Sequence, residues 1–284
     1  MKLVQCTYQA RSRLGLLTDG DKAVKLLSEE TLPTSTVQLL ELGTPAHVRE
    51  LLRAAESSAP TVPLAEVQLR APVTRPDKVL CIGMNYVDHC AEQNQPVPTE
   101  PVVFNKFPSC IVGPADDIVL PSATSQLDWE VELAVVIGQR CRAVSREQAA
   151  DYIFGYTVAH DVSARDWQLH RNGGQWLLGK AMDTFCPLGP SLVTADALEP
   201  HALALACRVN GATRQNSTTR QLVFDCHQVV AHISQCLTLL PGDVILTGTP
   251  PGVGVFMKPP QFLQRGDVVE CEIEGIGTIR NRVV

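Results

Sequence analysis

Residues 128–138 read Asp-Trp-Glu-Val-Glu-Leu-Ala-Val-Val-Ile-Gly, and this stretch predicts the most clearly defined strand of the chain, Asp128–Ile137. Successive residues of a strand point to opposite faces. One face is then apolar throughout, whereas the other starts with Asp128, Glu130 and Glu132 and turns apolar after them. Carboxylates two residues apart on one face lie about 6–7 Å apart at the backbone. The stretch therefore predicts a strand that places paired carboxylates beside an apolar surface.

Such a pair of carboxylates is typical of a metal site. Burying carboxylates without partners is strongly unfavourable, and a divalent cation between them would remove that penalty. Oxygen ligands favour a hard cation, namely Mg²⁺, Mn²⁺ or Ca²⁺. A third carboxylate, Asp161, ends the predicted strand Tyr152–His160 on a face of small side chains. The alternatives are an exposed face with paired charges and, for Asp161, an ordinary Asx turn.

A second group of polar residues follows the predicted strand Lys78–Gly83. Asn85 is a suitable N-cap for a helix over Tyr86–Glu92. His89 and Glu92 are three residues apart and so lie on one face of that helix. A carboxylate beside an imidazole fixes its tautomer and raises its basicity, as a general base requires. A surface ion pair is the alternative.

Two further segments could contact an anion. Lys180 ends the run Trp176–Lys180, which we interpret as an apolar strand followed by a lysine; such a lysine can neutralise an enolate, or it can lie at the surface. The glycines of Thr247–Gly254 allow backbone N–H groups to approach an anion. A tight turn between strands is the alternative there.

Composition narrows the class of protein. The 284 residues are 45% apolar and 19% charged, as expected for one large globular domain or one with a small addition. With 24 basic and 30 acidic residues the net charge is −6, which argues against nucleic acid and membrane partners. The ten cysteines contain no C-x-x-C pair, and the seven histidines contain no H-x-x-x-H, so we expect reduced core cysteines and no zinc site.

Short β-branched runs separated by proline and glycine dominate from about residue 78 and predict a β-rich α+β fold. Residues 1–70 are predicted to form a small N-terminal cap region, and residues 71–284 the main domain. The other elements expected are helices at Thr36–Leu42, Pro45–Ala55, Ser145–Ala150 and Val229–Leu240, a strand at Val102–Lys106, and a hairpin at Asn210-Gly211.

Six ordered motifs give residues 75–284 a resemblance to the fumarylacetoacetate hydrolase family. They are CIGMNYVDHCAE (81–92), DWEVELAVVIG (128–138), GYTVAHDVSARDWQ (155–168), WLLGK (176–180), PLGP (187–190) and PGDVILTGTPPGVG (241–254).

The resemblance implies a mixed β-roll or barrel, a homodimer, and a Mg²⁺ or Mn²⁺ ion held by Glu130, Glu132 and Asp161. It assigns His89 and Glu92 as the base pair on a helix that closes over substrate, and Lys180 as the catalytic lysine. It places Arg165, Gln168 and Thr249 near the substrate. Met84 replaces an arginine of the acylpyruvate-cleaving branch, and residues 1–70 do not resemble the N-terminal domain of the founding hydrolase.

The branch with the greatest resemblance implies keto–enol tautomerisation of oxaloacetate, a small 2-oxo dicarboxylic acid, in the mitochondrial matrix. No presequence is visible, and a cytoplasmic location is the alternative. The same site could instead hydrolyse C–C bonds of acylpyruvate-like acids or decarboxylate oxaloacetate. A metal-binding homologue without catalysis is the non-enzymatic alternative.

Overall fold

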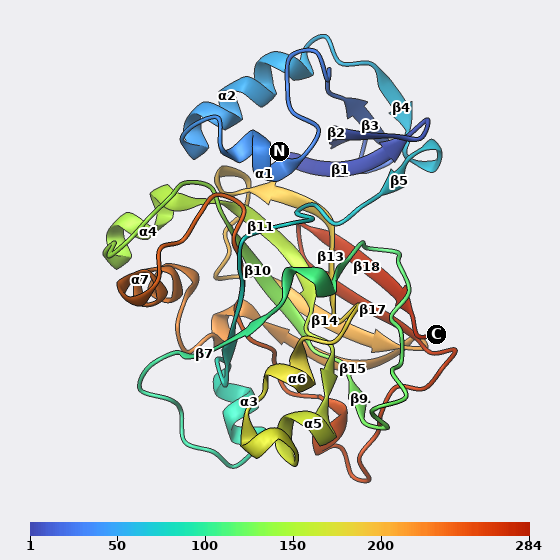
Figure 1. Cartoon of the computed structure of the whole chain (residues 1–284), viewed down its shortest axis with the longest axis vertical. Coiled ribbons are helices and arrows are strands. Elements are labelled where there is room, and N and C mark those ends of the chain that lie inside the picture. Colours follow the sequence, from blue (N-terminus) through green and yellow to red (C-terminus); the bar gives the residue numbers. More distant parts are fainter.

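The computed structural model describes residues 1–284, which form a β-rich α+β fold (Figure 1). The α-helices are α1 (Thr36–Leu40), α2 (Pro45–Glu56), α3 (Val87–Glu92), α4 (Arg146–Tyr152), α5 (Arg165–Leu169), α6 (Leu177–Lys180) and α7 (Cys226–Cys236). The strands are β1 (Lys2–Tyr8), β2 (Arg11–Thr18), β3 (Ala23–Leu26), β4 (Thr61–Pro63), β5 (Gln68–Leu69), β6 (Val79–Gly83), β7 (Val102–Lys106), β8 (Ile111–Val112), β9 (Leu127–Asp128), β10 (Val131–Ile137), β11 (Ile153–His160), β12 (Ser163–Ala164), β13 (Cys186–Thr194), β14 (Ala204–Val209), β15 (Ala212–Thr218), β16 (Val244–Leu246), β17 (Val268–Ile273) and β18 (Gly277–Arg282).

Most strands belong to one mixed sheet of twelve. Its order is β4-β3-β2-β1-β13-β11-β10-β16-β6-β7, with β5 on β1 and β8 on β13. The outer strands β4 and β7 do not pair with each other, so the expected roll is present as an open sheet and not as a closed barrel. A second sheet, β15-β14-β17-β18, packs against it through β13 and β18, and β9 pairs with β12.

The predicted strand Asp128–Ile137 is present but interrupted. Trp129 and Glu130 separate β9 from β10, because the Asp128 carboxylate accepts hydrogen bonds from the N–H groups of Trp129 and Gly254, at 2.8 and 2.7 Å. Strand β10 lies between β11 and β16, and every one of its residues is buried. The carboxylates at its start, Glu130 and Glu132, are therefore inside the protein.

Two helix starts follow the sequence prediction and one does not. Thr44 caps α2 ahead of Pro45, and Ser145 caps α4 in a capping box with Gln148. Asn85, however, is not the N-cap of α3, which begins after Tyr86. Its amide instead donates to the carbonyl oxygens of Thr247 and Phe224, at 2.7 and 3.0 Å, and accepts from the Phe224 N–H. The predicted cap is thus a bridge between distant segments.

Other predicted elements differ in extent or kind. Helix α7 starts three residues earlier and ends four residues earlier than Val229–Leu240, because Asp225 caps it. The expected strand before Lys180 is instead the short helix α6. The hairpin at Asn210-Gly211 is confirmed between β14 and β15, and both turn residues have positive φ, which glycine tolerates without strain.

The first 70 residues, in blue at the top of Figure 1, continue the large sheet through the pairing of β1 with β13. The division at residue 70 stays a prediction. All ten cysteines are free and nine are buried, as expected. None of the helices combines the length and apolar character needed to span a bilayer.

Candidate active site

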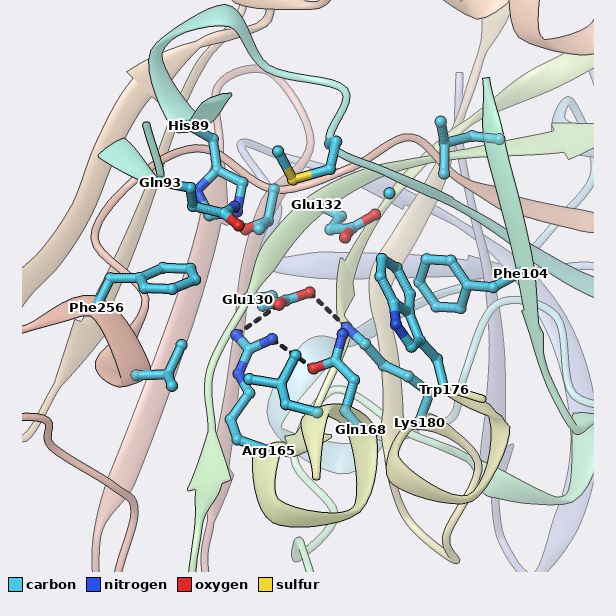
Figure 2. Close-up of a pocket in the computed structure, with 16 residues that line it drawn as sticks. His89, Gln93, Phe104, Glu130, Glu132, Arg165, Gln168, Trp176, Lys180 and Phe256 are labelled. Carbon is cyan, nitrogen blue, oxygen red and sulfur yellow. Dashed lines mark hydrogen bonds and ion pairs between the residues drawn. The ribbon is translucent and has the colours of Figure 1, made fainter. Parts of the chain in front are cut away.

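A small cavity of about 80 Å³ lies where α3, α5 and α6 gather at the end of the large sheet opposite the N-terminal strands (Figures 1 and 2). Phe104, Trp176 and Phe256 form apolar parts of its wall. The polar side chains that line it include most of those singled out from the sequence, namely His89, Glu130, Glu132, Arg165, Gln168, Lys180 and Thr249.

The three predicted carboxylates meet beside this cavity. Glu130, Glu132 and Asp161 are buried, and each offers an oxygen within 4.8 Å of the others. The sheet brings them together, since His160 pairs with Val131 and the Asp161 N–H donates to the Glu130 carbonyl at 2.9 Å. The structure therefore brings together three carboxylates from two neighbouring strands.

Glu130 is neutralised by two cations. Lys180 Nζ lies 2.8 Å from Glu130 Oε2, and Arg165 Nη2 lies 2.6 Å from Oε1 (Figure 2). Burial alone would raise the pKa of Glu130, but the charges of Lys180 and Arg165 lower it to about 2. Glu130 is thus held as a carboxylate.

Glu132 has no ion-pair partner. Its Oε2 accepts one hydrogen bond, from the Gly248 N–H at 2.6 Å. Burial, together with the charges of Asp161 and Glu130, raises its pKa well above 4.5. A positive charge among the three carboxylates would offset this repulsion.

One carboxylate oxygen of Asp161, Oδ1, accepts no aligned hydrogen bond. Lys180 Nζ donates to its Oδ2 at 2.8 Å. Lys106 Nζ lies 2.7 Å from Oδ1, yet this buried oxygen accepts no aligned hydrogen bond. Three buried carboxylates, one without an ion pair and one with an oxygen that accepts no aligned hydrogen bond, fit a hard divalent ion.

The glycine turn after β16 supports the carboxylates. Gly248 has φ +102°, and a Cβ there would lie 2.8 Å from that of Asn85, so only glycine suits the position. Its N–H faces Glu132, so the N–H group expected to meet an external anion is occupied by the protein's own carboxylate. Thr249 Oγ1 donates to the Val131 carbonyl and accepts from Gln215 Nε2; a contact of Thr249 with substrate stays a prediction.

His89 and Glu92 form the expected pair on α3. Glu92 Oε2 lies 2.8 Å from His89 Nδ1, and Glu92 Oε1 accepts the Gly252 N–H at 2.8 Å. Gln93 Nε2 lies 2.7 Å from the other ring nitrogen, Nε2. With Glu92 accepting at Nδ1, the neutral ring carries its proton there and has a lone pair at Nε2.

Arg165 and Gln168 occupy adjacent turns of α5. Arg165 Nε donates to Asp128 Oδ2 and its Nη1 to Gln168 Oε1, both at 2.8 Å. Together with the pair to Glu130, these contacts fix the guanidinium in the cavity wall (Figure 2).

A family model described as the C-terminal part of fumarylacetoacetate (FAA) hydrolase matches residues 78–284. The chain belongs to the fumarylacetoacetate hydrolase family. The match covers every residue of the candidate site, whereas the first 77 residues lie outside it.

Relatives within the fumarylacetoacetate hydrolase family are similar over the whole chain. The bovine protein named oxaloacetate tautomerase FAHD2A, mitochondrial, is 55% identical, over 100% of this chain and 92% of its own. A fumarylacetoacetate hydrolase structure from Exiguobacterium antarcticum has 37% identity and a TM-score of 0.87, covering 100% of this chain and 99% of its own. Maleylpyruvate hydrolase from Sphingobium sp. SYK-6, in complex with manganese(II) and pyruvate, has 31% identity and a TM-score of 0.82 with the same coverage.

The sequence patterns did not identify three residues that contact the site. Asp128 binds Arg165, Lys106 contacts Asp161, and Gln93 contacts His89. Lys106 ends an apolar strand, the same signal that pointed to Lys180. Gln93 directly follows Glu92, but no sequence rule directs its amide to the imidazole.

Proposed function

We propose that this chain is an oxaloacetate tautomerase that uses Mg²⁺ or Mn²⁺ and interconverts the enol and keto forms. The observation that carries the proposal is the position of His89 on the same small cavity as the buried carboxylates Glu130 and Glu132. The name of the bovine relative supports oxaloacetate as substrate.

Glu130, Glu132 and Asp161 would hold the cation. When bound, a divalent cation supplies Lewis-acid polarisation of a substrate carbonyl. The manganese in the related maleylpyruvate hydrolase structure supports this assignment.

Proton transfer falls to His89. Its Nε2 lone pair accepts a proton from substrate carbon or oxygen, and Glu92 stabilises the resulting imidazolium through Nδ1. Gly252 fixes Glu92 from the other side. The returned proton comes from the same nitrogen, so no net proton is consumed and the two tautomers interconvert.

Lys180 and Arg165 supply positive charge at the cavity. Both are fixed by ion pairs to Glu130, so they need not reorganise when negative charge develops on the substrate. The positive charge of these two residues favours an anionic 2-oxo acid over a neutral substrate.

Hydrolysis of a 1,3-dicarbonyl acid is the second candidate, and the related maleylpyruvate hydrolase supports it. Decarboxylation of oxaloacetate and loss of catalysis are the remaining alternatives. These reactions would all use the same site residues, so only the product that is formed can distinguish one from another.

The test is to follow the ultraviolet absorbance of enol-oxaloacetate with purified protein and Mg²⁺, then after adding EDTA. We expect metal-dependent acceleration without release of pyruvate. No acceleration by folded, metal-loaded protein would contradict the proposal, and cleavage of an acylpyruvate panel would establish the hydrolase instead.

The mitochondrial location in the name of the bovine relative supports the same compartment for this chain. The homodimer expected from the family resemblance stays a proposal, which sedimentation analysis would test.

A further inference from the structure

Two histidines and an aspartate meet at the start of α7, outside the carboxylate site. His201, Asp225 and His227 are partly buried, and each offers one ligand atom within 4.8 Å of the others. The two imidazole rings lie edge to face, with centroids 5.2 Å apart and an interplanar angle of 89°. His201 comes from the segment before β14, whereas Asp225 is the N-cap of α7 and His227 lies in its first turn.

We propose that His201, Asp225 and His227 form a second metal site, specific for a borderline transition-metal ion such as Zn²⁺. Imidazole ligands favour Zn²⁺, Cu²⁺ or Ni²⁺ over Mg²⁺. Two imidazoles and one carboxylate are a recurrent zinc ligand set that leaves a fourth position for water. The partial exposure of all three residues gives such an ion access from solvent.

The surroundings of His201 identify the nitrogen that would bind. Its Nδ1 lies 3.5 Å from Glu199 Oε1, while its Nε2 accepts a long hydrogen bond of 3.2 Å from the Cys226 N–H. A histidine ligand usually donates its other ring N–H to a carboxylate or carbonyl. Nε2 is therefore the ligand atom, and Glu199 orients the ring through Nδ1.

Binding through Nε2 displaces only a weak contact. The Cys226 N–H is in the first turn of α7, where N–H groups have no partner within the helix.

Asp225 can cap α7 and bind a metal ion at the same time. Its Oδ1 accepts the Gln228 N–H at 2.8 Å, and Arg146 pairs with Oδ2. Each carboxylate oxygen has a second lone pair. The Arg146 side chain is 57% exposed and can move into solvent when a cation arrives.

The sequence pattern gave no sign of this site. The residues occur as a histidine 24 positions before an Asp-x-His, and neither H-x-x-x-H nor C-x-x-C is present. The expectation of no zinc site rested on those local spacings, whereas the fold brings the ligands together over a long range.

The test uses the full chain with saturating Mg²⁺, which occupies the carboxylate site. Zn²⁺ is titrated by calorimetry, and Co²⁺ serves as a spectroscopic probe because its visible absorption reports nitrogen ligation. The variants are His201→Ala, His227→Gln and Glu199→Gln, with His232→Ala as the matched control on α7. Circular dichroism without metal checks that each variant is folded.

We expect one Zn²⁺ per chain in the wild type and in His232→Ala. Glu199→Gln should weaken binding about 10–100-fold, and loss of either histidine ligand at least as much. Unchanged Zn²⁺ affinity in both histidine variants overturns the proposal. A wild-type protein that does not bind Zn²⁺ stoichiometrically would also overturn the proposal. So would a Glu132→Gln variant that no longer binds Zn²⁺, because the ion would then lie at the carboxylates. None of these outcomes depends on tautomerase activity.

Discussion

The side-chain amide of Gln93 lies 2.7 Å from Nε2 of His89, the ring nitrogen opposite the one that Glu92 holds. Both residues line the cavity (Figure 2). An amide N–H donated to Nε2 occupies the lone pair that a general base needs. In the structure Glu92 therefore orients the His89 ring, while the Gln93 amide blocks the Nε2 lone pair.

Removing this amide should expose the base. We expect Gln93→Ala to raise kcat/KM for enol-oxaloacetate about fivefold, the equivalent of one net hydrogen bond of about 1 kcal/mol. Stopped-flow ultraviolet absorbance measures the effect. A tenfold or greater fall in kcat would instead show that the amide takes part in catalysis or substrate binding.

The roles of His89 and the carboxylates can be separated. His89→Ala should lower kcat about 10²–10⁴-fold, the usual contribution of a positioned acid–base group, while Mn²⁺ binding stays unchanged. Electron paramagnetic resonance of Mn²⁺ measures binding, and the exposed His170→Ala is the control. Full activity in His89→Ala would remove it as the base.

Sequence rules located the carboxylates because their signal is local. An exposed face or an Asx turn was the alternative for these acidic residues, but Glu130, Glu132 and Asp161 are buried and lie together. The rules misjudged Trp176–Lys180, since a short apolar run fits either a strand or a helix. Tertiary packing decides: a Cβ on Gly179 would lie 2.6 Å from the Gln168 backbone nitrogen, so α6 packs directly on α5.

Asn85 is a second residue whose role local sequence rules could not predict. Local propensity makes an asparagine after a strand a cap, but its partners Phe224 and Thr247 lie 139 and 162 residues away. Only the fold reveals them. The His201 cluster was missed for the same reason, since its ligands come from separate segments.

The two glutamates of the site should respond oppositely to neutralisation. Glu130→Gln leaves Arg165 and Lys180 without a shared partner, so in EDTA we expect the free energy of unfolding to fall by about 3–5 kcal/mol. Glu132→Gln removes a carboxyl group that has no ion pair, so stability should stay unchanged or rise while Mn²⁺ binding is lost. Urea unfolding with and without Mn²⁺ measures both. Equal destabilisation by the two variants would contradict this charge arrangement.

The Asn85 bridge should couple the stability of the fold to the position of His89. Asn85→Ala removes hydrogen bonds to Thr247 and Phe224 just before α3, so we expect a loss of about 3 kcal/mol at roughly 1 kcal/mol per bond. Because the segment before α3 then keeps only its backbone contacts, kcat should fall more than KM changes, with Mn²⁺ affinity retained. Urea unfolding and steady-state kinetics measure the two effects, with the exposed Asn216→Ala as control. A stability loss with unchanged kcat would show that α3 keeps His89 in place without this bridge.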